Sequence, residues 1–106
     1  MSTDLAAKTK RFRSGMEAAG FTISGHDHPI CPVMTYDAHK NQALGRLMAD
    51  EGIFVIPFSY PVVASGKERI RVQISTTHTN EDIDRTVAAF IKGGLELGII
   101  GHKAVE

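Results

Sequence analysis

In the segment Gly66 to Ser75, GKERIRVQIS, polar and apolar residues alternate from Arg69 onward. Its apolar positions are Ile70, Val72 and Ile74. A period of two is typical of a β-strand with one buried face. The opposite face of this strand would carry two arginines, Arg69 and Arg71.

These two arginines are candidates for binding an acidic small molecule. The planar fork of a guanidinium matches a carboxylate or a phosphate, and a rigid strand would hold it in one pose. The simpler interpretation is a solvated strand face, because most charged side chains face water. From the alternation alone, Arg69 and Arg71 are equivalent.

Hydrophobic spacing and cap residues predict the remaining elements on both sides of this strand. We expect helices over about residues 4–19 and 38–51, short strands at 30–35 and 53–56, and a closing helix that begins after Thr79. Pro32 has no N–H for a strand ladder, so the 30–35 strand is an edge strand or pairs only after Pro32. The 53–56 run, IFVI, is apolar throughout, which favours a strand covered on both faces and ended by Pro57.

The order helix, strand, helix, strand, strand, helix predicts an α+β fold. We expect one domain over residues 1–106, with a small three-stranded, mainly antiparallel sheet and helices packed on one of its faces. The other face would then be partly apolar and uncovered, which suggests that the chain packs against something larger.

Composition excludes several classes of protein. Twelve basic and twelve acidic residues give zero net charge, so a nucleic-acid binder is not indicated. A basic run on the first helix, Lys8, Lys10, Arg11 and Arg13, is interpreted as a solvated face. The single cysteine, Cys31, cannot form an internal disulfide, and its apolar surroundings predict a buried, inert thiol. No apolar stretch approaches the roughly 20 residues of a membrane helix.

Other motifs do not assemble a catalytic set. His26, Asp27 and His28 offer metal ligands, but they lie in one loop without a second cluster, so no metal site is expected. The hydroxyl-rich segment Ser75–His78 precedes a helix cap, and turn formation explains it better than nucleophilic catalysis. No lysine lies in an apolar sequence that would suit a Schiff base. We therefore expect no catalytic residue, cofactor-binding residue or metal ligand in this chain.

Several segments, in order, resemble the C-terminal part of a known family. They include FRSGMEAAGFTI at 12–23, PICPVM at 29–34, EGIFVI at 51–56, FSYPVV at 58–63, and GKERIRVQIS at 66–75. The chain resembles the α-oxoamine synthases, pyridoxal-phosphate enzymes that condense an amino acid with an acyl-CoA, over about residues 5 to 100. It departs from that pattern at Pro57 and at Ala64-Ser65, in the loop that leads to the arginine strand.

The resemblance implies a small C-terminal domain of a fold-type-I enzyme that is normally a homodimer, with the large cofactor-binding domain absent from this chain. It is nearest to the members that condense glycine with acetyl-CoA into 2-amino-3-oxobutyrate, in threonine degradation, in the bacterial cytoplasm or the mitochondrial matrix. By position, Arg71 corresponds to the anchor of the substrate carboxylate, whereas Arg69 inherits no role. The isolated chain would be inactive, because the large domain binds the pyridoxal phosphate.

A hypothesis of a different class stays open at this point. A three-stranded α+β layer with an exposed arginine could also be a stand-alone amino-acid-binding or regulatory module.

Overall fold

The computed structural model describes residues 3–25 and 28–101. The elements, in chain order, are α1 (Thr3–Ala19), β1 (Ile30–Met34), α2 (Ala38–Asp50), β2 (Ile56–Phe58), β3 (Arg69–Gln73) and α3 (Asn80–Leu97). This is the predicted order of helices and strands. Within the described residues, no helix has both the length and the apolar character needed to cross a membrane.

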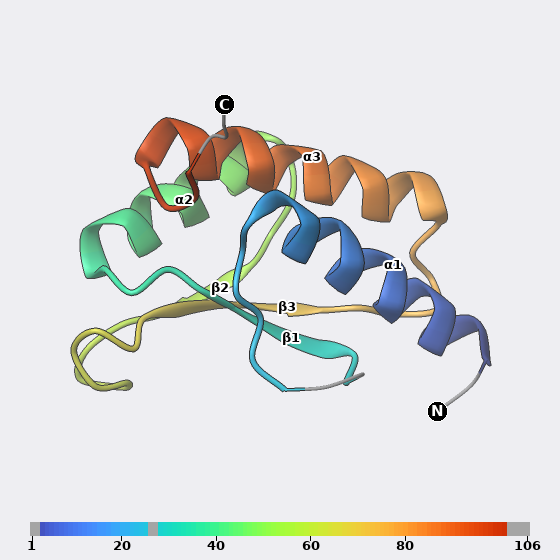
Figure 1. Ribbon diagram of the computed structural model, residues 1–106, viewed down its shortest axis with the longest axis horizontal. Helices are drawn as coiled ribbons and strands as arrows, with labels where there is room; N and C mark the ends of the chain where they lie inside the picture. Colours follow the sequence, from blue (N-terminus) through green and yellow to red (C-terminus); the bar gives the residue numbers. More distant parts are fainter. Residues whose placement is uncertain (1–2, 26–27, 102–106) are drawn as a thin grey trace.

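The three strands form one antiparallel sheet in the order β1-β3-β2, so the arginine strand is the central one. All three helices lie on the same side of this sheet, as Figure 1 shows. The α+β prediction and the one-sided covering by helices are therefore confirmed. In the described part of the chain, no helix covers the other face of the sheet, and we call this the open face (Figure 1).

The core lies between the sheet and the helices. Ile70 and Val72 of β3 are buried there, as the alternation in GKERIRVQIS predicted. Phe90 of α3 is at its centre, with edge-on ring contacts to Phe12 at 6.2 Å and to Phe21 at 5.9 Å between centroids. These contacts join α1 and α3 above the sheet.

Local capping explains where α2 and α3 begin. The Asp37 carboxylate accepts a hydrogen bond from the N–H of Lys40 at 2.9 Å. Thr79 and Asp82 form the expected capping box, with reciprocal side-chain bonds of 2.9 and 3.0 Å. These bonds to backbone N–H groups lower the pKa values of the Asp37 and Asp82 carboxyls.

The prediction for the 53–56 run is wrong. Residues 53–55 are irregular, and β2 begins only at Ile56 and includes Pro57. Phe54 is 86% exposed and Ile56 is 47% exposed, so the run is not covered on both faces. The reason is that β2 is a sheet edge, where a proline can direct its missing N–H away from the ladder.

Pro32 also lies in an edge strand, which confirms the first of the two interpretations of that proline. The pairing of β1 with β3 extends from Ile30 to Met34, so it begins before Pro32 and includes it. The outer side of β1 is bonded to the preceding segment, where Ser24 N donates to the Pro32 carbonyl at 3.1 Å.

Replacing Gly94 by Ala is expected to destabilise the chain, although alanine is the better helix former. A Cβ at this position would lie 2.6 Å from Cζ of Phe21 and 3.2 Å from Cγ1 of Ile100. Overpacking of this kind costs about 1–3 kcal/mol, which exceeds the gain of about 1 kcal/mol in helix propensity. Urea unfolding followed by circular dichroism measures the difference.

The control is the exposed Ala88 on the same helix. Ala88→Gly should lower the free energy of unfolding by about 1 kcal/mol through helix propensity alone. Alanine is therefore expected to be the more stable residue at position 88, and glycine at position 94. A Gly94→Ala chain more stable than the parent would contradict the packing described above.

Candidate functional site

Arg71 lies in the middle of the open face. It is directly opposite Pro32 on β1 and Ile56 on β2, so neither strand places a charged residue next to it. Its side chain is half-buried, as is that of Arg69. Residues opposite each other in antiparallel strands project to the same face, so the surroundings of Arg71 are largely apolar.

The guanidinium of Arg71 stacks on an aromatic ring. Its Cζ lies 5.5 Å from the ring centroid of Phe58, which is within the range of a cation–π contact. Phe58 is opposite Arg69 in the register, so Arg71 reaches it diagonally across β2 and β3. The sequence analysis did not single out Phe58.

Arg71 forms no hydrogen bond or ion pair with the residues that the structure describes. Glu68, the acidic residue closest to Arg71 in the sequence, is buried, and its carboxylate accepts a hydrogen bond from the N–H of Gly66 at 2.9 Å. The phenyl ring of Phe58 has no oxygen or nitrogen atom that could accept a hydrogen bond from the guanidinium. The N–H donors in its plane therefore stay available for a carboxylate.

A buried asparagine holds the end of β2 in place. Asn41 of α2 is 0% exposed, and its Nδ2 donates to the Phe58 carbonyl at 3.0 Å and to Oγ of Ser59 at 3.1 Å. Its Oδ1 accepts the hydroxyl of Thr35 at 2.8 Å. Asn41 therefore ties together the ends of β1 and β2.

The position of Asn41 in the sequence is itself a signal of its role. Asn41 lies three residues before Leu44 and seven before Met48, on the buried stripe of α2. An asparagine on such a stripe needs hydrogen-bond partners within the fold. Those partners come from β1 and from the segment after β2, which only the tertiary structure identifies.

Large apolar side chains are exposed near the end of the sheet where Arg69 lies. β1 ends at Met34 and β2 ends at Phe58, and both residues are opposite Arg69. The segments that follow expose Tyr36 (54%), Tyr60 (71%) and Val62 (74%). Exposed apolar side chains of this size are typical of a surface that packs against another domain or chain.

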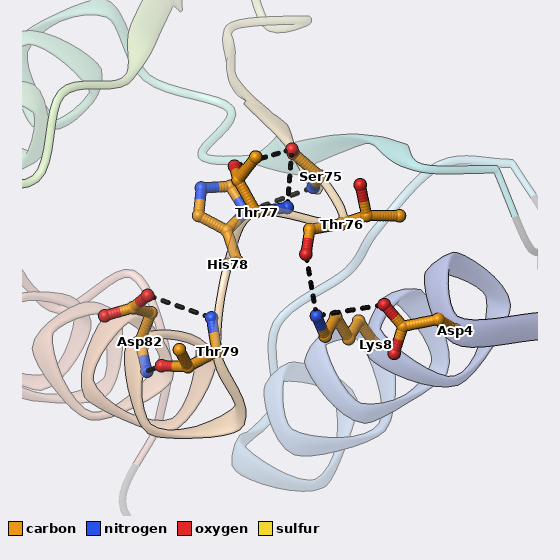
Figure 2. A network of polar contacts seen from close by, with 8 residues as sticks. All are labelled: Asp4, Lys8, Ser75, Thr76, Thr77, His78, Thr79 and Asp82. Atoms are coloured by element: carbon orange, nitrogen blue, oxygen red, sulfur yellow. Dashed lines mark hydrogen bonds and ion pairs between the residues drawn. The ribbon is translucent and has the colours of Figure 1, made fainter.

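The segment Ser75–His78 is a turn, as expected. Ser75 N donates to Nδ1 of His78 at 3.0 Å, and Thr77 N donates to Oγ of Ser75 at 3.1 Å. Figure 2 shows Lys8 of α1 reaching this turn, where its Nζ donates to the Thr76 carbonyl at 2.9 Å and pairs with Asp4 at 3.1 Å. These contacts attach α1 to the loop between β3 and α3.

Arg13 does not belong to a solvated basic face, so that part of the prediction is wrong. Its side chain is 7% exposed, and its guanidinium makes five hydrogen bonds of 3.0 to 3.3 Å to backbone carbonyls. The carbonyls belong to Ser24, Gly25, His28 and Ile30. Arg13 therefore organises the segment before β1, whereas Arg11 is exposed and pairs with Asp84 at 2.7 Å.

The cysteine prediction is confirmed, and the metal prediction is only partly covered by the described residues. Cys31 is 0% exposed, and burial raises the pKa of its thiol to about 11. Among residues 3–25 and 28–101, no group of three or more His, Cys, Asp or Glu side chains forms a metal site. His26 and Asp27 lie outside the described residues.

The chain is similar in sequence to enzymes from both a mammal and a bacterium. The chain is 64% identical over 90 residues to the mitochondrial 2-amino-3-ketobutyrate coenzyme A ligase of Mus musculus, which covers 85% of this chain and 22% of the relative. It is 50% identical over 96 residues to the 2-amino-3-ketobutyrate coenzyme A ligase of Escherichia coli K12, covering 91% and 24%. The chain thus spans less than a quarter of the length of these relatives.

Structure comparison supports the same fold. The chain superposes on the Sphingomonas wittichii serine palmitoyltransferase with a TM-score of 0.86 at 20% sequence identity. The superposition covers 92% of this chain and 25% of that protein. The Aminotransferase class I and II family matches residues 1–90. The resemblance drawn from the quoted segments is therefore confirmed, and the chain belongs to the aminotransferase class I and II family.

Proposed function

We propose that this chain is the C-terminal small domain of a pyridoxal-phosphate-dependent glycine C-acetyltransferase, also called 2-amino-3-ketobutyrate coenzyme A ligase. The complete enzyme would condense glycine with acetyl-CoA into 2-amino-3-oxobutyrate and release CoA. The 64% identity to the mouse relative over 90 residues carries this proposal.

Arg71 is the residue to which we assign a binding role. Its guanidinium, on the central strand of the open face, is free of hydrogen bonds and ion pairs to the described residues. It would hold the glycine carboxylate in a bidentate, charge-assisted pair. This contact fixes the orientation of the α-carbon relative to the reacting groups, which is a large part of what a positioning arginine contributes to rate.

We propose that none of the described lysines forms a Schiff base with the cofactor. A Schiff-base lysine is normally desolvated or placed next to another cation. The described lysines do not fit this requirement: Lys10, Lys67 and Lys92 are exposed, and Lys8 pairs with Asp4 at 3.1 Å. Lys40 lies in the first turn of α2, close to the Asp37 cap. We therefore assign the pyridoxal phosphate to the remainder of the enzyme.

The remainder of the enzyme also accounts for the uncovered sheet. We propose that a large domain outside this chain faces the open face and completes the site around Arg71, and that the complete enzyme is a homodimer. The exposed side chains of Tyr60 and Val62, in the segment that follows β2, support such packing. A role in threonine degradation, in the bacterial cytoplasm or the mitochondrial matrix, follows from the same assignment.

The experiment that tests the function is glycine-dependent release of CoA by the full-length protein, followed with a thiol reagent. We expect turnover with glycine and acetyl-CoA, and much lower turnover when palmitoyl-CoA replaces acetyl-CoA or serine replaces glycine. A full-length protein that releases CoA only with a long-chain acyl-CoA would contradict the assignment of substrates.

The isolated 106-residue chain serves as the matched control. We expect it to show no turnover and no heat of binding when it is titrated with glycine in a calorimeter. Measurable glycine binding by the isolated chain would instead favour the stand-alone amino-acid-binding module.

A further inference from the structure

We propose that Phe58 is a positioning residue for the substrate carboxylate and acts by orienting the guanidinium of Arg71. The inference deepens the proposed function and rests on it, because Phe58 has this role only if Arg71 binds the carboxylate. The observation that carries it is the 5.5 Å distance from Cζ of Arg71 to the ring centroid of Phe58.

A long arginine side chain on an open sheet needs something to limit its rotamers. Its direct cross-strand neighbours, Pro32 and Ile56, carry no side-chain acceptor. A carboxylate neighbour would hold Arg71, but it would also occupy the donors that the substrate needs. An aromatic face restrains the guanidinium and leaves the donors in its plane unused, so the phenyl ring suits this position better than an acidic residue.

The ring can orient Arg71 only if the ring itself is held in place. β2 has three residues, with a proline in the middle, so its ladder to β3 alone is short. The Asn41 amide adds a bond of 3.0 Å to the Phe58 carbonyl, and Asn41 is completely buried. Phe58 is half-buried, and its backbone is fixed from both β3 and α2.

The test is the equilibrium affinity of the full-length holoenzyme for glycine, measured by calorimetry without acetyl-CoA. Phe58→Leu keeps an apolar side chain and removes the aromatic face. We expect it to weaken glycine binding by about three- to tenfold, whereas Phe58→Tyr should stay within about twofold of the parent. Phe58→Met provides a second ring-free variant if the leucine variant does not fold.

The matched control is Phe54→Leu. This variant removes the same aromatic ring from a residue four positions earlier in the chain. Phe54 is 86% exposed, and among the described residues it makes no aromatic contact with Arg71. We expect its glycine affinity to be that of the parent. An equal loss in Phe54→Leu would overturn the specific role of Phe58.

A double-mutant cycle with Arg71→Lys separates orientation from general structural support. If Phe58 acts by orienting the guanidinium, Phe58→Leu should change glycine affinity little in the Arg71→Lys background. Lysine has a flexible, strongly hydrated ammonium with no planar fork, so its donors depend less on the ring for their orientation. The same three- to tenfold loss in both backgrounds would indicate a structural role and overturn the inference.

The cycle also distinguishes failure of the inference from failure of the proposed function. If Arg71→Lys weakens glycine binding and Phe58→Leu does not, only the positioning role of Phe58 is wrong. If Arg71→Lys leaves glycine affinity unchanged, the carboxylate assignment to Arg71 is itself wrong.

Discussion

Replacing Arg71 by Ala in the full-length enzyme is expected to raise the KM for glycine about 100-fold or more. Truncating one partner of a hydrogen-bonded charge pair costs about 2–5 kcal/mol of binding free energy. Each 1.4 kcal/mol of binding free energy changes the dissociation constant about tenfold. The KM for acetyl-CoA should change far less, because Arg71 is assigned to the amino-acid carboxylate. Steady-state kinetics with each substrate varied in turn measures both constants.

Arg69→Ala is the matched control for this experiment. Arg69 lies on the same strand, projects to the same open face and is likewise half-buried, but the structure shows no aromatic contact for it. We expect the glycine KM of this variant to stay within about threefold of the parent, because Arg69 is assigned no contact with the carboxylate. If glycine kinetics were unaffected by Arg71→Ala, or equally affected by both variants, Arg71 would not be the carboxylate anchor. Retained cofactor absorbance in both variants would show that the rest of the site is intact.

Arg13→Met is expected to lower the free energy of unfolding by about 3 kcal/mol. The substitution keeps much of the apolar stem but removes five hydrogen bonds to backbone carbonyls of the segment before β1. Hydrogen bonds from a charged donor are worth about 1.5–3 kcal/mol each, part of which is offset by no longer burying the charge. Urea unfolding of the chain, followed by circular dichroism, gives the difference.

Arg11→Met controls for the loss of a positive charge on the same helix. Arg11 is exposed, and its partner is the single carboxylate of Asp84, whose pKa it lowers. Water screens such a pair, so the loss of stability should be much smaller than at Arg13. Equal effects at the two positions would mean that the carbonyl contacts of Arg13 contribute little.

Much of the fold could be predicted from local patterns. The alternation in GKERIRVQIS placed Ile70 and Val72 in the core, and the Thr79 to Asp82 spacing predicted the cap of α3. Both signals are short-range, because a period of two or a capping box depends on residues only a few positions apart. For the IFVI run, the same reasoning gave a wrong prediction, because hydrophobicity alone does not distinguish a strand covered on both faces from an exposed segment at the sheet edge.

The candidate site divides in the same way. The sequence by itself determined the arginine strand, the polar face that it presents and, through resemblance, the choice of Arg71 over Arg69. Only the tertiary structure decided that Phe58 lies under the guanidinium of Arg71, that Asn41 secures the end of β2, and that Arg13 is buried among carbonyls. These contacts join residues 11 to 17 positions apart in the chain, so chain folding, and no local periodicity, brings them together.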